Sequence, residues 1–235
     1  MQSATDENAR RTAKLRAAEW AAAQIKDGMA VGLGTGTTSA LVIDAVGKRV
    51  AAGLRITAIA TSEESQRHAL ALGIPMSDFA HLPALDLTID GADEVQEGSL
   101  NLIKGHGGAL LREKIVASAS ARLLIAVDPS KLVTQLGSLF TVPVEVVPFG
   151  WETTAVRLHN FAPELRIQEN GHPYLTDGNH FILHCNIADS GFTPKQAAEI
   201  FKATLGVVEH GLFLGMASKV VIGGSDGIRI LEKTP

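Results

Sequence analysis

The chain has 235 residues, and 46% of them are hydrophobic, so it can bury a full core in one or two domains. Its 21 basic and 25 acidic residues give a net charge of −4 with no Lys- or Arg-rich segment, which excludes the basic footprint of a nucleic-acid-binding protein. A single cysteine, Cys185, excludes an internal disulfide framework, and without a signal peptide or a membrane-length apolar run we expect a cytoplasmic globular protein.

Apolar strand patterns alternate with helical patterns along the first 130 residues. We expect helices over residues 6–26, 38–46, 63–72 and 109–119, and strands over residues 29–33, 55–60, 85–89 and 123–127. Apolar strands that alternate with helices pair in parallel, with helices on both faces of the sheet. The sequence therefore predicts an α/β fold with a Rossmann-like parallel sheet.

The pattern changes after about residue 141. A strand over 142–147, at a sheet edge because of Pro143, precedes a helix over 153–160 and strands over 165–168 and 174–186. A helix over 193–204 and a strand over 207–213 complete the split βαβ order of a second, smaller ferredoxin-like α+β domain. Residues 219–222 and 228–231 predict a closing hairpin that returns to the first sheet. The predicted domains are 1–141 plus 214–235, and 142–213.

A glycine-rich turn, Gly32–Thr38, follows the first strand and opens a helix. Backbone N–H groups and the helix dipole at such a turn face an anion. The dinucleotide fingerprint requires glycine where Thr37 stands and an acidic residue after the second strand, and this chain has neither. The hydroxyls of Thr35, Thr37 and Thr38 therefore favour a single phosphate. The alternative is a tight strand-to-helix turn that binds nothing.

Charged residues stand at corresponding ends of later strands. Asp90 and Asp93 follow an apolar strand, Lys104 follows another and precedes a glycine-rich loop, and Glu113 lies about one turn into the next helix. Carboxylates at that position can exchange the proton of a sugar hydroxyl, and a lysine beside them can stabilise an oxyanion. The alternatives are an Asx-capped turn for the aspartates and a surface glutamate favoured by the helix dipole for Glu113.

Three other patterns resemble those of known functional sites, but we expect no functional site at any of them. His180 and His184 share a strand face without the helical spacing of a zinc site, so we expect no metal. Cys185 lies on an apolar strand and reads as a small buried hydrophobic residue. Ser225 matches a nucleophile elbow, but no histidine follows it in the sequence, so it indicates a hairpin turn.

Taken in order, these segments resemble the A-type ribose-5-phosphate isomerases, a metal-free family, over essentially the whole chain. The motifs are Gly32–Thr38, Thr61-Ser62-x-x-Ser65, Asp90–Glu94, the Lys104 loop with Ala109-Leu110 and Arg112–Lys114, Asp128-x-Ser130-Lys131, Pro143–Val146 and the closing Gly-x-x-Asp-Gly hairpin. His106 stands where members often carry glycine, and it lacks the backbone freedom of glycine.

The resemblance implies interconversion of D-ribose 5-phosphate and D-ribulose 5-phosphate through an enediolate, in the non-oxidative pentose phosphate pathway and without a cofactor. Glu113 would be the base that carries the proton between C2 and C1. Asp90 would move the hydroxyl proton, Asp93 would hold Lys104 or the sugar, and Lys104 would stabilise the enediolate oxygen. The implied substrate contacts are Thr35, Gly36, Thr37, Thr38, Asp90, Gly91, Ala92, Asp93, Lys104, Gly105, His106, Gly107 and Lys131. The family also suggests a homodimer or homotetramer.

Two functions of other classes remain as alternatives. The sugar-phosphate-sensing domain of some bacterial repressors shares this fold, but those chains carry an N-terminal DNA-binding helix pair, and here a single helix precedes the first strand. An enzyme similar to coenzyme A transferases also shares the architecture, and it would need a glutamate that becomes esterified. A coupled assay with ribose 5-phosphate separates the three.

Overall fold

The computed structural model describes residues 2–232. The helices are α1 (Gln2–Ala23), α2 (Thr37–Ala51), α3 (Glu63–Ala71), α4 (Leu110–Ser118), α5 (Trp151–Arg157) and α6 (Pro194–Ala203), with 3₁₀ turns η1 (Pro129–Lys131) and η2 (His159–Phe161). The strands are β1 (Ala30–Leu33), β2 (Thr57–Ala60), β3 (Leu87–Asp90), β4 (Glu94–Gln96), β5 (Leu102–Ile103), β6 (Leu123–Val127), β7 (Leu132–Val133), β8 (Val142–Val146), β9 (Glu164–Leu165), β10 (Phe181–Cys185), β11 (Val207–His210), β12 (Leu212–Phe213), β13 (Lys219–Gly224) and β14 (Gly227–Glu232).

The largest sheet has the strand order β14-β13-β6-β3-β1-β2. Its strands pair in parallel, except that β14 runs antiparallel to β13 and closes the predicted hairpin. Helices α1 and α2 pack their apolar residues, such as Ala21 and Val46, on one face of the sheet. Ala117 of α4 packs on the other face beside Ile125. The prediction of a parallel sheet covered on both faces is confirmed.

The smaller sheet has the order β11-β8-β10-β9, and its neighbouring strands are antiparallel. With α5 between β8 and β9, and α6 between β10 and β11, this is the predicted split βαβ arrangement. The prediction that Pro143 places its strand at an edge is wrong, because β8 lies between β10 and β11. Pro143 is tolerated because it is the second residue of the strand, where β11 has already ended and Gly211 donates to its carbonyl at 2.7 Å.

A third sheet, β12-β5-β4-β7, lies between the other two and was not predicted. The stretch expected as one strand over residues 207–213 is divided at Gly211 into β11, which joins the smaller sheet, and β12, which pairs with β5. The Gly211 carbonyl accepts the Lys104 N–H at 2.9 Å, and a Cβ on Gly211 would overlap the Lys104 carbonyl oxygen. The close approach of two backbones thus requires glycine at this junction.

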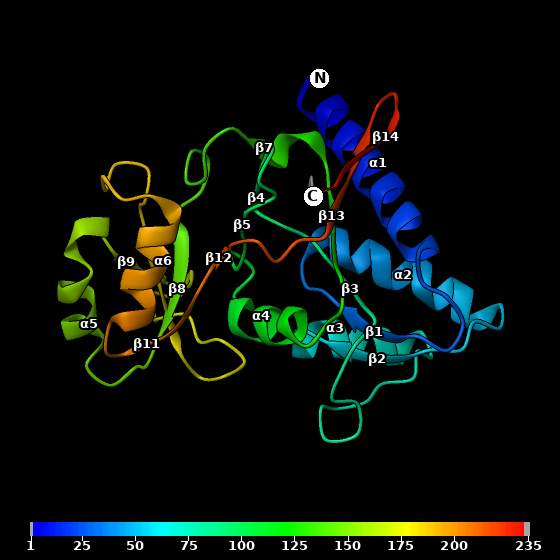
Figure 1. Cartoon of the computed structure of the whole chain (residues 1–235), viewed down its shortest axis with the longest axis horizontal. Helices are drawn as coiled ribbons and strands as arrows, with labels where there is room; N and C mark the ends of the chain where they lie inside the picture. The colour runs from blue at the N-terminus through cyan, green and yellow to red at the C-terminus, as the bar shows by residue number, and fades with distance from the viewer. Residues whose placement is uncertain (1, 233–235) are drawn as a thin grey trace.

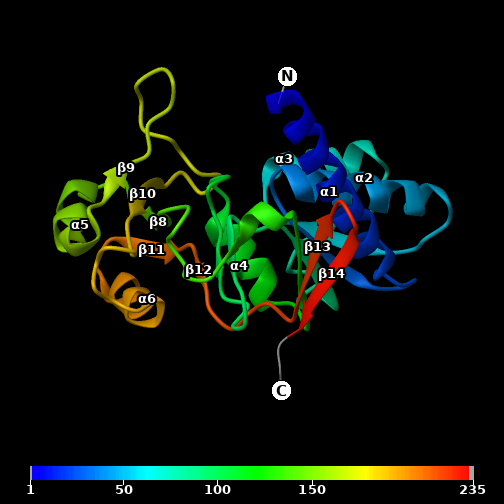
Figure 2. The same ribbon diagram turned by 90° about the horizontal axis from the view of Figure 1, so that it is seen from above.

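Figures 1 and 2 show the smaller sheet with α5 and α6 as one lobe, the large sheet with α1 to α3 as the other, and α4 between them. The division into residues 1–141 plus 214–235 and 142–213 remains a prediction, and its residues 1 and 233–235 lie outside the described part of the chain. None of the helices within residues 2–232 is long and apolar enough to cross a membrane.

Candidate active site

A cavity opens where β1, β3 and β5 end, beside the start of α4. Its lining residues are Lys14, Thr35, Gly36, Thr37, Thr38, Gly91, Ala92, Asp93, Lys104, Gly105, Gly107, Glu113 and Lys131. The structure therefore brings together residues that the sequence selected from separate segments. Two selected residues, Asp90 and His106, lie next to the cavity without lining it.

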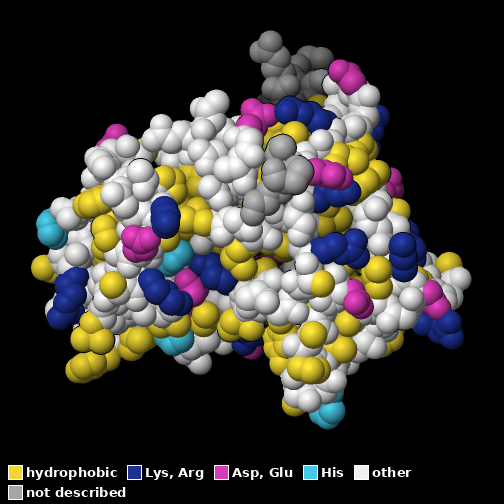
Figure 3. Space-filling model, viewed as in Figure 1, with side chains coloured by type: hydrophobic (Ala, Val, Ile, Leu, Met, Phe, Trp, Pro, Cys, Tyr) yellow, Lys and Arg dark blue, Asp and Glu magenta, His cyan; other side chains and the backbone are white. Residues whose placement is uncertain are grey.

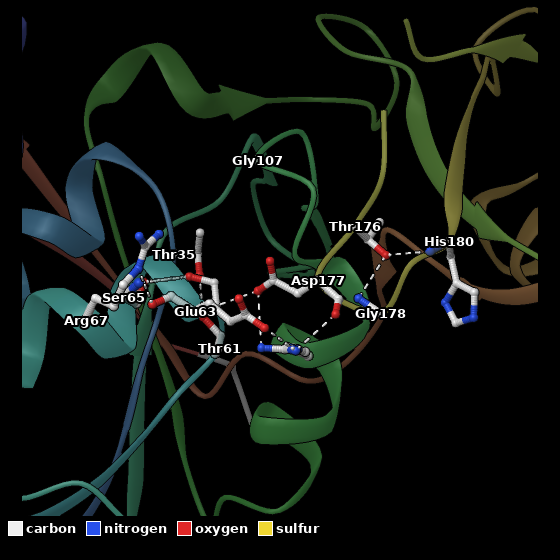
Figure 4. Close-up of polar contacts among 12 residues, drawn as sticks. Thr35, Thr61, Glu63, Ser65, Arg67, Gly107, Thr176, Asp177, Gly178 and His180 are labelled. Atoms are coloured by element: carbon white, nitrogen blue, oxygen red, sulfur yellow. Dashed lines mark hydrogen bonds and ion pairs between the residues drawn. The ribbon is translucent and has the colours of Figure 1, made fainter. Parts of the chain in front are cut away.

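Hydrogen bonds to carboxylate and hydroxyl groups hold the glycine-rich turn in place. The Thr35 N–H donates to Asp90 Oδ1 at 3.1 Å, and the Thr35 hydroxyl contacts the Thr61 hydroxyl at 2.7 Å and the Ser65 hydroxyl at 3.3 Å (Figure 4). Gly36 has a φ of 97°, a conformation that glycine adopts without strain, just before α2 begins. The first turn of α2 therefore presents its N–H groups to the cavity.

Lys14 is a lining residue that the sequence reasoning missed. It comes from α1, and its Nζ donates to the Thr37 hydroxyl at 3.0 Å. Helical periodicity identified α1 but does not show which side chain reaches another element. Lys14 and Lys131 thus add two cations to Lys104 on the cavity wall, and they can hold an anion.

Asp90, Lys104 and Glu113 form a buried charged cluster. Lys104 Nζ lies 3.0 Å from Asp90 Oδ2 and 3.3 Å from Glu113 Oε1, and it donates to the Gly91 carbonyl at 2.7 Å. The three side chains are at most 5% exposed. Burial alone would lower the pKa of Lys104, but Asp90 and Glu113 outweigh it and raise that pKa, so the lysine is a fixed cation.

Glu113 is the least satisfied member of the cluster. Burial raises its pKa to about 8, Lys104 opposes that rise, and Asp90 and Asp93 add to it. Within the described residues, Glu113 Oε2 has no hydrogen-bond partner. Glu145 Oε2 is in the same situation, but it lies outside this cavity. A carboxylate with a pKa near 8 and an unoccupied oxygen in a cavity has the properties of a general base.

The two aspartates after β3 occupy different environments. Asp90 is 1% exposed, and its Oδ1 accepts hydrogen bonds from the Thr35 N–H, the Gly91 N–H and the Ser39 hydroxyl. Asp93 lines the cavity, with Oδ2 accepting the His106 N–H at 3.0 Å. Asp93 therefore faces the cavity, while Asp90 holds Lys104 and the glycine turn.

Glu94, the nearest rival to Glu113 as a base, has a structural role. It is fully buried and accepts the N–H groups of Gly137, Leu139 and Phe140 at 2.6 to 2.7 Å. Through these three hydrogen bonds Glu94 holds the loop before β8. Glu94 does not line the cavity.

His106 fits the glycine-rich loop because its position does not require glycine. Gly105 and Gly108 have φ values of 105° and 89°, whereas His106 is not among the described residues with positive φ. Its ring packs 4.9 Å from Phe140 and 5.0 Å from His184 and turns toward the smaller sheet. The His106 side chain is therefore engaged outside the cavity, which His106 does not line.

The patterns set aside in the sequence have structural roles. His180 Nδ1 lies 2.9 Å from Glu145 Oε1, and within residues 2–232 no group of His, Cys, Asp and Glu side chains could hold a metal ion. Cys185 is buried, which raises its pKa to about 12 and leaves it as an apolar packing residue. Ser225 lies in the turn between β13 and β14.

Comparison with known proteins places these residues in a family. A model of the family described as ribose 5-phosphate isomerase A (phosphoriboisomerase A) matches residues 57–227. The ribose-5-phosphate isomerase A of Synechococcus sp. (strain JA-3-3Ab) is 49% identical over 224 residues, which cover 94% of this chain and 97% of that protein. The chain belongs to the ribose 5-phosphate isomerase A family.

Other members of the ribose 5-phosphate isomerase A family agree in sequence and in structure. The protein from Gloeobacter violaceus is 50% identical over 219 residues, covering 93% of this chain and 95% of that protein. The solved structure from Methanocaldococcus jannaschii has a TM-score of 0.87 at 35% identity and covers 94% of this chain and 98% of its own. A D-ribose-5-phosphate isomerase solved in complex with phospho-erythronic acid has a TM-score of 0.89 at 35% identity, covering 94% and 97%.

Proposed function

We propose that the Asp90–Lys104–Glu113 cluster carries the reaction of the family, the interconversion of D-ribose 5-phosphate and D-ribulose 5-phosphate. The observation that supports it most is Glu113, a buried carboxylate on the cavity wall with an unpartnered oxygen and a pKa raised to about 8. Moving hydrogen between adjacent carbons requires one base that reaches both. Glu113 takes the C2 proton and returns it at C1, with no redox cofactor in the step.

Lys104 supplies the charge that the intermediate needs. Removing the C2 proton places negative charge on the carbonyl oxygen, and a buried cation that is already oriented stabilises that charge without reorganisation. The Asp90 carboxylate and the Gly91 carbonyl hold the ammonium group in place. Lys104 thereby lowers the energy of the enediolate more than that of the sugar.

Hydroxyl-proton transfer is proposed for Asp93, with Asp90 as the group that orients Lys104. The sequence assigned this transfer to Asp90, but Asp90 Oδ1 has three donors and Oδ2 faces Lys104, whereas Asp93 lines the cavity. Asp90→Asn and Asp93→Asn variants separate the two assignments. If Asp93→Asn keeps its activity and Asp90→Asn loses it, Asp90 moves the proton.

The phosphate is proposed to bind at the opposite end of the cavity. The hydroxyls of Thr37 and Thr38, the N–H groups at the start of α2, and the ammonium groups of Lys14 and Lys131 offer donors and positive charge there. The structure of a relative with phospho-erythronic acid supports binding of a phosphorylated sugar acid by this fold.

The coupled assay that converts ribulose 5-phosphate to a coloured or reduced product tests the proposal directly. We expect the purified chain to isomerise ribose 5-phosphate, and to do so after treatment with a chelator. Failure with this substrate would favour one of the other classes, a sugar-phosphate sensor or an enzyme that resembles coenzyme A transferases. Activity that disappears with chelator and returns with zinc or magnesium would contradict the metal-free mechanism.

We also propose that the chain forms a homodimer or homotetramer and works in the cytoplasm. Hydrophobic side chains gather at the lower left of Figure 3, at the end of the lobe that carries α5 and α6. Val147, Phe149, Val156 and Leu205 are exposed in this lobe, at 39%, 94%, 70% and 77%. Light scattering on the purified protein tests the oligomeric state, and a monomeric mass would exclude it.

A further inference from the structure

Residues 166–180, here termed the arm, connect β9 to β10 and reach the glycine-rich loop 105–108. Arg166 Nη1 donates to the His106 carbonyl at 2.9 Å, and its guanidinium stacks 3.8 Å from the centre of the Tyr174 ring. The Tyr174 hydroxyl donates to the Gly107 carbonyl at 3.4 Å. A Cβ on Gly108 would overlap the Tyr174 side chain, so the arm and the loop are in direct contact.

These contacts fix the orientation of the peptide between His106 and Gly107. The carbonyl and the N–H of a trans peptide point in opposite directions, and the described residues contain no cis peptide. Because the His106 carbonyl points at Arg166, the Gly107 N–H points away from the arm, and Gly107 lines the cavity. Within residues 2–232, no acceptor is found for that N–H, whereas Asp93 accepts the preceding one.

The far end of the arm is anchored to the large lobe. Asp177 Oδ2 accepts the Glu63 N–H at 2.9 Å and lies 3.2 Å from Arg112 Nη1 (Figure 4). Next to it, the Thr176 hydroxyl donates at 2.9 Å to Glu145 of β8, which belongs to the smaller lobe. The arm is therefore held at both ends, which lets Arg166 keep a fixed position on the loop.

We infer that Arg166 is a positioning residue of the isomerase: it orients the 106–107 peptide so that the Gly107 N–H donates to a substrate oxygen that gains charge. This inference rests on the proposed function, since it assigns Gly107 as a second donor beside Lys104. Donors aimed at developing charge contribute most when they are oriented before the reaction, so loss of the orientation affects turnover more than substrate binding.

The experiment compares Arg166→Met, which removes the donor and keeps most of the aliphatic stem, with Arg166→Lys, which restores one donor for the single carbonyl. Arg67→Met is the matched control, because Arg67 also donates to a backbone carbonyl, that of Glu63, at 3.3 Å on the exposed surface of α3. We measure kcat and KM with ribose 5-phosphate, and the dissociation constant of phospho-erythronic acid, for the full chain and each variant.

We expect Arg166→Met to lower kcat about tenfold to hundredfold with KM changed less than about threefold, in line with loss or misplacement of one oriented donor. The affinity for phospho-erythronic acid should fall as well, because under this inference its carboxylate takes the place of the charged oxygen and accepts the same N–H. Arg166→Lys should recover most of kcat, and Arg67→Met should match the wild type.

Three results would overturn the inference. They are a kcat of Arg166→Met within threefold of the wild type, an equal loss in Arg67→Met, and a rise in KM that accounts for the whole loss. If Arg166→Met does not fold, Tyr174→Phe decides the question, because it removes only the hydroxyl that donates to the Gly107 carbonyl. An unchanged kcat then overturns the inference, and a lower kcat with constant KM supports it. An inactive wild type would instead refute the proposed function, so the two failures are distinguishable.

Discussion

Glu113 and Lys114 are adjacent in α4, yet they belong to two different charged clusters. The pKa of the glutamate is raised in one cluster and lowered in the other. Glu113 meets Lys104 in the cavity, and burial raises its pKa to about 8. Lys114 lies 2.9 Å from Glu209 Oε1, and Lys202 lies 2.9 Å from Glu209 Oε2. Burial opposes ionisation of Glu209 too, but the two lysines and a backbone N–H lower its pKa to about 2.

The difference between the two clusters is in how many oxygens are satisfied. Both oxygens of Glu209 have a lysine, so its carboxylate stays ionised and joins α4 to α6 and β11. Glu113 has one oxygen without a partner among the described residues and shares its single lysine with Asp90. A saturated carboxylate stabilises the fold, whereas an unsaturated one can accept a proton.

Replacing Glu113, the proposed base, should have the largest effect on activity. Glu113→Gln keeps the size of the side chain but cannot accept a proton, so we expect kcat to fall by at least about 10²-fold with KM little changed. Exchange of the substrate C2 proton with solvent should be lost in parallel. If Glu113→Gln stays within tenfold of the wild type while Glu94→Gln is inactive, the base is misassigned.

Removing the cation of the same cluster should have the next largest effect. Lys104→Ala should lower kcat by about 10²- to 10³-fold, as the loss of one oriented oxyanion donor does. The steady-state rate is measured with saturating ribose 5-phosphate. A variant that changes only KM would show that Lys104 binds the sugar without stabilising the intermediate.

The raised pKa of Glu113 predicts a pH dependence of about tenfold per unit below its midpoint. The base must be ionised, so kcat/KM should rise with pH and level off above about 8.

The raised pKa of Glu113 should also lower the stability of the protein at high pH. The folded pKa lies above the usual 4.5, so the free energy of unfolding should fall as pH rises from about 4.5 through about 8. Glu113→Gln should lack that fall, and denaturant titrations at several pH values measure it. Equal pH slopes in the two proteins would contradict the assignment.

A substitution in the Glu209 cluster should lower the free energy of unfolding and change kcat much less. Lys114→Met leaves one oxygen of Glu209 without its ion pair, so we expect about 2 kcal/mol less free energy of unfolding, the usual loss for a hydrogen bond to a charged group. Its kcat should stay within about tenfold of the wild type. A rate loss as large as that of Glu113→Gln at unchanged stability would show that the clusters are not separate.

The control for this prediction is Lys202→Met, which removes the other lysine of Glu209. Lys202 is 66% exposed, so solvent already screens its ion pair, and we expect a stability change below about 1 kcal/mol. If Lys202→Met loses more free energy of unfolding than Lys114→Met, the more buried lysine is not the one that stabilises Glu209 more, and the prediction is wrong.

The sequence was informative wherever local pattern decides position. Asp90 and the glycine-rich turn were predicted to converge because they follow strands of one parallel sheet, β3 and β1, and such strands end at the same edge. Lys104 was expected there by the same argument, but it follows β5 of the third sheet, which brings it to the same place by a route that the sequence did not show. Lys14 and Arg166 were missed because each reaches the site from a distant element through a side-chain contact that no periodicity encodes. The third sheet was missed for a related reason: its strands have two or three residues, too few to show an alternating pattern.

Gly211 has a consequence for engineering this enzyme. It does not line the cavity, yet its carbonyl accepts the Lys104 N–H and its N–H donates to the Pro143 carbonyl in the smaller lobe. An exchange of lobes between relatives would therefore have to keep this joint, because the Gly211 backbone bonds Lys104 on one side and Pro143 on the other. A chimaera that loses glycine at this position would place a Cβ against the Lys104 carbonyl oxygen and would have to shift the backbone that carries the proposed catalytic lysine.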